Sequence, residues 1–122
     1  MLKLYSEVDG QAKQSCGNII RDIIEANENK ALVDQLVEKI SLEAQKLKVA
    51  PWTDSDSDMG PVISKEHKEK IEEYISIGVN EGAKLVEDGR NYNIQGYENG
   101  FFVGPTLFDN VTKEMTIYKE EI

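Results

Sequence analysis

The clearest hydrophobic periodicity in the sequence lies between residues 31 and 48. Apolar residues recur there near helical spacing, at Leu32, Leu36, Ile40 and Leu47. Charged and amide side chains fill most of the positions between them, so the pattern predicts an amphipathic helix with one apolar face. We expect Pro51 to end this helix, because the residue before a proline avoids the helical conformation.

A second helix is predicted to begin after Ser64, whose hydroxyl can accept a hydrogen bond from a backbone N–H of the first turn. The apolar positions that follow have the spacing of a buried stripe, at Ile71, Tyr74, Ile75, Gly78 and Val79. Gly82 is suited to end the helix, because glycine adopts positive φ angles at little steric cost.

Short strands are expected after this helix. Residues 83–87 are predicted to form one, and the succession of helix, glycine and strand is half of a crossover unit. This favours an α/β fold, with helices packed on a small, mainly parallel sheet. A further strand is expected to begin at residues 101–103 and to continue to Phe108. Pro105 should lie at an edge, a bulge or an end, because it has no N–H for the ladder. Residues 116–118 are a last strand candidate.

Two other segments have weaker or purely polar patterns. Residues 18–26 contain two isoleucine pairs that fit one face of a helix, although β-branched side chains also suit a strand, and a helix is the prediction. Residues 53–58 form a polar loop with alternating acidic side chains. A calcium-binding loop of the EF-hand type is excluded, because the sixth and twelfth positions counted from Asp54 are Met59 and Lys65 instead of glycine and glutamate.

Composition narrows the class of protein. The chain has 122 residues, of which 39% are hydrophobic and 30% charged, as in one soluble globular domain. The formal net charge of −9 disfavours nucleic acids and acidic membrane surfaces as partners, and no apolar run approaches the length of a membrane span. Cys16 and His67 are the only cysteine and histidine, which excludes an internal disulfide and a cysteine-based zinc site. The single cysteine fits a protein of a reducing compartment, and we expect no metal site.

Four segments resemble the aldehyde dehydrogenase family in the family's own order. The pair Gly60-Pro61 precedes a helix, and Glu81-Gly82-Ala83 is similar to a helix-to-strand junction of the family. The segment GYENGFFVGPTL at residues 96–107 resembles the methylmalonate-semialdehyde branch in particular, and MTIYKEEI at residues 115–122 resembles the family's Lys-Glu-Glu-Ile run. In the family that run continues into Phe-Gly-Pro, so we expect the chain to be a fragment of a longer enzyme.

The resemblance implies a specific activity. Such enzymes oxidise malonate or methylmalonate semialdehyde with NAD, through a cysteine thiolate that attacks the aldehyde, and the acyl group then passes to coenzyme A. A thiolate suits this chemistry because it is a strong nucleophile and a good acyl leaving group. Residues 31–122 would be part of the catalytic domain, and residues 1–30 a divergent N-terminal segment. Family members work in bacterial cytoplasm and in mitochondria; the cytoplasm is the prediction, because no targeting sequence is evident at the start of the chain.

The resemblance also implies roles for individual residues. Glu121, the second glutamate of its run, would accept hydrogen bonds from the nicotinamide ribose hydroxyls. His67 and Lys70 stand at positions that approach the cofactor's ribose, with a solvated helix face as the alternative interpretation. Cys16 is the candidate nucleophile. Its context departs from the family's Gly-Gln-Arg-Cys, because Ser15 replaces the arginine and three extra residues intervene, so a small buried hydrophobe is the competing interpretation.

Two classes of function remain open at this point. The first is an inactive or complementing piece of an NAD- and coenzyme A-dependent oxidoreductase. The second is a non-catalytic binding or scaffold protein that reuses the family's helices. In both, Phe101, Phe102, Leu107 and the helix stripes should form the core. Apolar surface left without its family neighbours predicts exposed patches, marginal stability, and association with a second copy or with the rest of the enzyme.

Overall fold

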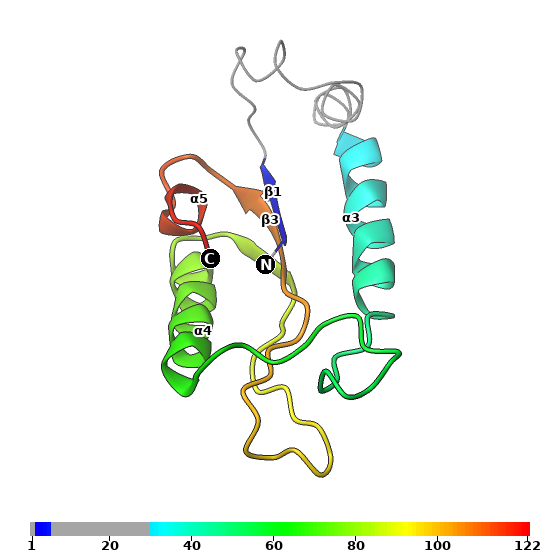
Figure 1. Ribbon diagram of the computed structural model, residues 1–122. Coiled ribbons are helices and arrows are strands. Elements are labelled where there is room, and N and C mark those ends of the chain that lie inside the picture. Colours follow the sequence, from blue (N-terminus) through cyan, green and yellow to red (C-terminus); the bar gives the residue numbers. More distant parts are fainter. Residues whose placement is uncertain (1, 6–29) are drawn as a thin grey trace.

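The computed structural model describes residues 2–5 and 30–122 (Figure 1). In chain order the elements are β1 (Leu2–Tyr5), α3 (Lys30–Ala44), α4 (Lys65–Asn80), β2 (Lys84–Glu87), β3 (Leu107–Val111) and α5 (Thr116–Lys119). The helix predicted for residues 18–26 lies outside the described residues, as does Cys16. None of the helices in the described ranges has the length and apolarity of a membrane span.

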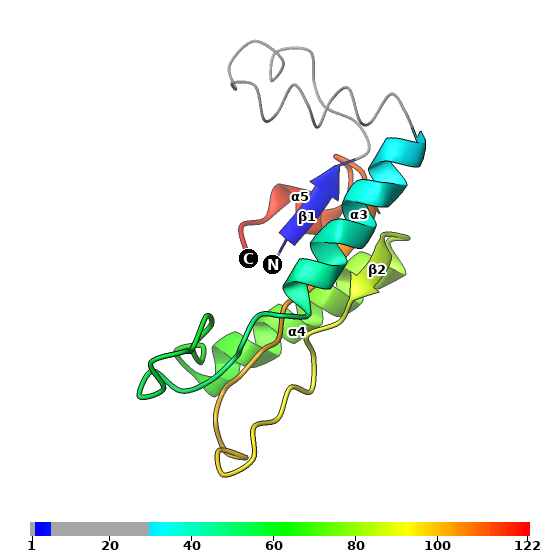
Figure 2. The same cartoon turned by 90° about the vertical axis from the view of Figure 1, so that its right-hand side faces the viewer.

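The three strands form one sheet in the order β1-β3-β2. Strand β1 runs parallel to β3, with Leu2 opposite Leu107, and β2 runs antiparallel to β3, with Leu85 opposite Phe108. Helices α3 and α4 lie on opposite sides of this sheet, as the two views in Figures 1 and 2 show. The predicted α/β class is confirmed.

The described sheet is mixed instead of mainly parallel, because one of its two pairings is parallel and the other is antiparallel. Parallel neighbours need a crossover that carries the chain back to the starting end of the sheet, usually through a helix. Between β2 and β3 the chain instead makes a loop over residues 88–106 that returns from the end of β2. The two strands therefore pair in opposite directions, as in a wide hairpin.

Helix α4 follows the predicted start and stop signals. Ser64 caps it, with its Oγ accepting a hydrogen bond from the backbone N–H of His67 at 3.2 Å. At the other end Gly82 adopts a φ of 98°, and the N–H of Ala83 donates to the carbonyl of Gly78 at 3.0 Å. This is the reversal for which a glycine at the helix end is needed, and it directs the chain into β2.

The end of α3 differs from the prediction. The helix ends at Ala44, well before Pro51, so the proline does not end it. The N–H groups of Lys46 and Leu47 bond to carbonyls three residues earlier and tighten the last turn, a common way for a helix to finish. The predicted apolar face of α3 is also only partly covered, since Leu32 is 49% exposed.

The main core cluster consists of Ile75, Ala83, Phe108, Val111 and Ile117. Phe102 and Leu107 are buried as predicted, whereas Phe101 is half-buried. Val79 was wrongly placed in the buried stripe of α4, since 42% of it is exposed. At 100° per residue it stands about 90° around the helix from the centre of the stripe.

Two strand predictions near the C-terminus were wrong. Residues 101–106 belong to no strand, because β2 pairs with β3 only from Leu107 onward and Pro105 has no N–H to donate. Residues 116–118 lie in the short helix α5. Its single buried side chain, Ile117, packs onto α4 and the sheet instead of joining the sheet edge.

Large apolar side chains are exposed, as predicted. The most exposed are Ile63 at 89% and Trp52 at 84%, both in the segment between α3 and α4.

Stability should depend sharply on which isoleucine is truncated. Ile75→Ala removes a fully buried side chain and should lower the free energy of unfolding by about 2–5 kcal/mol. Ile63→Ala makes the same chemical change at an exposed site and should alter it by no more than about 0.5 kcal/mol. Urea unfolding followed by circular dichroism compares the two, and equal effects would contradict this core.

Candidate functional site

Two of the candidate cofactor-binding residues lie in the first half of α4. His67 and Lys70 are three residues apart and both exposed. The Lys70 ammonium lies 5.6 Å from the centroid of the Tyr74 ring, within the range of a cation–π contact. The aromatic ring therefore holds this positive charge against the helix while leaving it open to solvent.

Glu121 follows α5 and is exposed. Its neighbour Ile122 packs against the main core cluster, and Tyr74 packs against the same cluster. Figure 1 shows the C-terminus beside α4, in agreement with the contact between α4 and α5. The structure thus brings the segment that carries Glu121 to the helix that carries Lys70. Cys16 lies outside the described residues.

Helix α5 is seated on the last turn of α4 by two different contacts. Ile117 is fully buried, and a Cβ placed on Gly78 would come within 2.8 Å of its Cδ1. Beside it, the Glu81 carboxylate accepts hydrogen bonds from the backbone N–H and the hydroxyl of Thr116, each at 2.6 Å. Apolar packing and a charge-assisted bond together fix the direction of the final residues.

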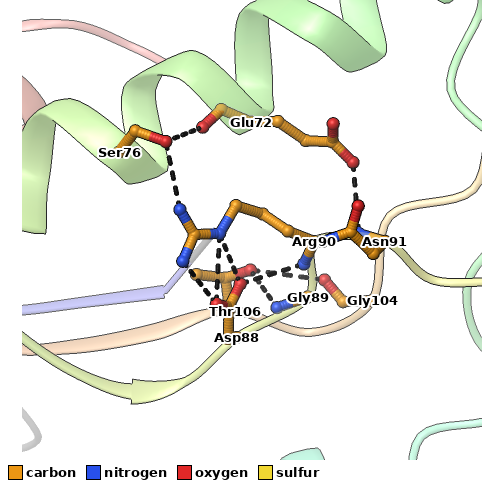
Figure 3. A network of polar contacts seen from close by, with 8 residues as sticks. All are labelled: Glu72, Ser76, Asp88, Gly89, Arg90, Asn91, Gly104 and Thr106. Carbon is orange, nitrogen blue, oxygen red and sulfur yellow. Dashed lines mark hydrogen bonds and ion pairs between the residues drawn. The ribbon is translucent and has the colours of Figure 1, made fainter.

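A polar network ties the loop after β2 to α4 (Figure 3). The Arg90 guanidinium donates to both oxygens of Asp88, with Nη2 at 2.5 Å from Oδ2, and through Nη1 to the Ser76 hydroxyl at 3.0 Å. Ser76 in turn donates to the carbonyl of Glu72 at 2.9 Å. The Arg90 guanidinium beside Asp88 holds the pKa of that carboxyl below its ordinary value of 3.8.

The loop also makes a backbone contact with the same helix. The N–H of Asn91 donates to the Glu72 carboxylate at 3.3 Å, and Asn91 has a positive φ of 55°. Lys68 Nζ lies 3.9 Å from the same carboxylate. Glu72 therefore connects the loop to the turn of α4 next to Lys70.

Residues 88–106 close on themselves at two buried glycines. The N–H of Gly104 donates to the carbonyl of Gly89 at 2.8 Å, and the N–H of Gly89 donates to the Thr106 hydroxyl at 3.1 Å. A Cβ at Gly89 would lie 1.9 Å from the carbonyl oxygen of Gly104. Two backbone segments approach so closely here that no side chain fits between them.

On the other side of the sheet, β2 is bonded to α3. The carboxylate of Glu87 accepts hydrogen bonds from the Ser41 hydroxyl and from Gln45 Nε2, the latter at 2.7 Å. One glutamate at the end of β2 thus holds the last turn of α3.

An apolar groove of about 430 Å³ is lined by residues from the end of α3, from α4, from the start of β3 and from the loops beside them. Its described lining contains no charged residue and consists of Ala44, Leu47, Met59, Gly60, Val62, Ile71, Val103, Gly104, Pro105, Thr106 and Leu107. Over the ranges that the structure describes, no group of three or more His, Cys, Asp or Glu side chains could hold a metal ion. The described part of the chain therefore offers an exposed carboxylate at Glu121, an exposed cation at Lys70 and an apolar groove.

Sequence reasoning missed the contacts that hold these residues in place. Arg90 belongs to none of the motifs or periodic positions described above; its signal in the sequence is the adjacent Asp88-Gly89 pair, which is typical of a turn at which an aspartate accepts backbone N–H groups. In the sequence, Glu81 is identified only as part of the Glu81-Gly82-Ala83 segment, which resembles a helix-to-strand junction. Its signal was a glutamate at the C-terminal end of a helix, where the helix dipole disfavours negative charge.

Comparison with known proteins agrees with the resemblance seen in the sequence. The model of the Aldehyde dehydrogenase family matches residues 5–122. Malonate-semialdehyde dehydrogenase of Pseudomonas aeruginosa is 43% identical over 118 residues, which cover 96% of this chain and 24% of the relative. The mitochondrial methylmalonate-semialdehyde dehydrogenase [acylating] of Arabidopsis thaliana is 44% identical over 113 residues, which cover 93% of this chain and 18% of the relative.

A solved structure shows the same arrangement of the backbone. The aldehyde dehydrogenase of Mycobacterium tuberculosis complexed with NAD+ has a TM-score of 0.66 and 39% identity, over 72% of this chain and 18% of that one. The chain thus spans about a fifth to a quarter of the length of the relatives it matches.

Acid should weaken the contribution of Asp88 to stability. Because its pKa is lowered in the folded state, the ion pair with Arg90 stabilises the fold fully above the ordinary value of 3.8, and this contribution is lost as pH falls below it. Asp88→Asn should therefore lower the free energy of unfolding at pH 6 and make a smaller difference at pH 3. A difference between the two chains that stays constant over this range, in urea unfolding, would contradict the role of the pair.

The glycine closure can be tested with a matched pair of substitutions. Gly89→Ala must displace the backbone of Gly104 and should lower the free energy of unfolding by about 1–3 kcal/mol. Gly60→Ala meets no described atom within 4 Å and should change it by no more than about 0.5 kcal/mol. Thermal unfolding of both variants measures this, and a stable Gly89→Ala protein would show that the two segments can separate.

Proposed function

The chain belongs to the aldehyde dehydrogenase family, and from this membership we propose that it is part of an NAD-dependent enzyme that oxidises malonate or methylmalonate semialdehyde. Two relatives are named for these substrates, and another is complexed with NAD+. The observation that carries the proposal is the placement of the Lys-Glu-Glu-Ile run against α4, with Ile122 packed on the core and Glu121 exposed beside it.

Glu121 is proposed to bind the nicotinamide ribose. An ionised carboxylate can accept hydrogen bonds from two adjacent hydroxyls, and such charge-assisted bonds are stronger than bonds between neutral groups. Ile117 and Ile122 are packed on either side of it along the chain, which leaves the carboxylate free to face a ligand. Lys70, held over the Tyr74 ring, and His67 are proposed to approach the same ribose from α4.

These residues fit one part of the cofactor. The sequence contains no Gly-x-Gly-x-x-Gly fingerprint, so the surface for the pyrophosphate would come from elsewhere in the longer enzyme. NAD, when bound, accepts the hydride released as the aldehyde is oxidised. Cys16 is proposed as the thiolate nucleophile, and coenzyme A as the acyl acceptor, as the word acylating in the name of the Arabidopsis relative suggests.

The isolated chain is proposed to be inactive and to require the rest of the enzyme. Its matches cover about a fifth to a quarter of the relatives, and its apolar groove and exposed hydrophobic residues fit a surface that other segments cover. The cytoplasm is the proposed location, with the mitochondrial matrix as the alternative that the Arabidopsis relative supports.

An NMR titration with NAD tests the cofactor role. Amide signals around Glu121 and Lys70 should shift, and Glu121→Gln should weaken the apparent affinity roughly ten- to hundredfold, because a hydrogen bond to a charged group is lost. Glu73→Gln makes the same change at an exposed position of α4 and should leave the titration unaltered. A wild-type spectrum that does not move would instead favour the non-catalytic scaffold.

A further inference from the structure

Glu81 lies at the C-terminal end of α4, which is an unfavourable position for a carboxylate. It is the C-cap of α4, where the helix dipole leaves partial negative charge and a carboxylate is unfavourable. Within this described helix, the last turn also lacks a basic residue that would compensate. The position of Glu81 is therefore not explained by any benefit to α4.

The same carboxylate lies at the N-terminal end of α5, where backbone N–H groups need an acceptor. The cap residue of α5 is Met115, which makes no side-chain hydrogen bond to the cap among the described contacts. The first N–H of the helix belongs to Thr116 and donates instead to Glu81 Oε2, while the Thr116 hydroxyl donates to Oε1, both at 2.6 Å. Glu81 thus provides, from 35 residues away, the cap that the local sequence does not.

The bond joins the two segments that the proposed cofactor site uses. Helix α4 carries His67 and Lys70, and Glu121 follows Thr116 by five residues. The four-residue helix α5 begins at Thr116, and its buried side chain Ile117 packs against Gly78. Apolar packing of Ile117 and Ile122 on the core is not directional, whereas the two hydrogen bonds to Glu81 fix the orientation of the first turn of α5.

We propose that Glu81 is a positioning residue for the cofactor site: by capping α5 from the end of α4, it fixes where the Glu121 carboxylate stands relative to Lys70. The inference rests on the proposed function, because Glu121 must contact the ribose for its placement to matter. In this proposal Glu81 acts through Thr116 and α5, and not through a contact of its own with the cofactor.

The test uses four single variants of the whole chain, together with Glu121→Gln alone and combined with Glu81→Gln. Glu81→Gln keeps the shape of the side chain but replaces one acceptor oxygen with an amide that cannot accept a hydrogen bond. Thr116→Val removes the hydroxyl donor and keeps the backbone N–H, whereas Thr116→Ser keeps both donors and should behave as wild type. Glu73→Gln is the control for loss of one charge from α4.

Amide hydrogen exchange without cofactor examines the cap. In Glu81→Gln, exchange at residues 117–120 should be roughly tenfold faster, because the cap bond is weakened. Protection at Ile75 and Phe108 should be retained, which shows that the core is still folded. Thr116→Val provides the milder variant should Glu81→Gln fail to fold. Unchanged exchange at residues 117–120 in both variants would overturn the inference.

Titration with NAD examines the positioning. Glu81→Gln should weaken the binding of NAD roughly two- to tenfold, because its effect passes through Glu121. In a chain that already carries Glu121→Gln, the addition of Glu81→Gln should therefore cause no further loss of affinity. Additive losses would mean that Glu81 acts only on stability or binds independently, and would overturn the inference. A wild-type chain that does not respond to NAD refutes the proposed function and the inference together, whereas a wild-type response that Glu81→Gln leaves intact refutes the inference alone.

Discussion

Strand β3 lies between two other strands and in contact with the helical layer, so its apolar side chains are removed from water. Leu107, Phe108 and Val111 are each at most 1% exposed, and both β1 and β2 pair with this strand alone in the described sheet. Phe108 also approaches Gly78 of α4 and belongs to the same cluster as Ile117 of α5. Burial of this one strand therefore fixes α4, β2 and α5 relative to one another, and with them the surface that carries Lys70 and Glu121.

The local signals in the sequence were sufficient for α4 and β2. Ser64, the stripe around Ile75, and Gly82 each act within a few residues, so a reader of the sequence can place them. The start of β3 and the nature of α5 depend on partners far along the chain. Leu107, the first residue of β3, pairs with Leu2 and with Glu87, and the N–H of Thr116 at the start of α5 donates to Glu81. Neither relation leaves a trace in local periodicity.

In the candidate site, too, the sequence identifies some residues, whereas the contacts around them are seen only in the structure. The roles of Glu121, Lys70 and His67 are implied by the resemblance to a family, and the hydrophobic pattern alone indicates only three polar side chains on the surface. What the structure adds is the arrangement around them: a ring under Lys70, a loop bonded through Asn91 and Arg90 to the next turns of α4, and a capped helix before Glu121. Apart from the ring under Lys70, these contacts join residues 14 to 35 positions apart in the sequence, and a single sequence does not reveal which of them meet.

Trp52 gives this chain a natural optical signal. It is the only tryptophan, and 84% of it is exposed, on the segment that leads from α3 past the apolar groove. An indole in water emits at a longer wavelength than one in an apolar setting. The emission wavelength of Trp52 therefore reports on the environment of this segment and depends little on the core. If another polypeptide covered the segment, the tryptophan emission would shift to shorter wavelength, and no added label would be needed to detect it.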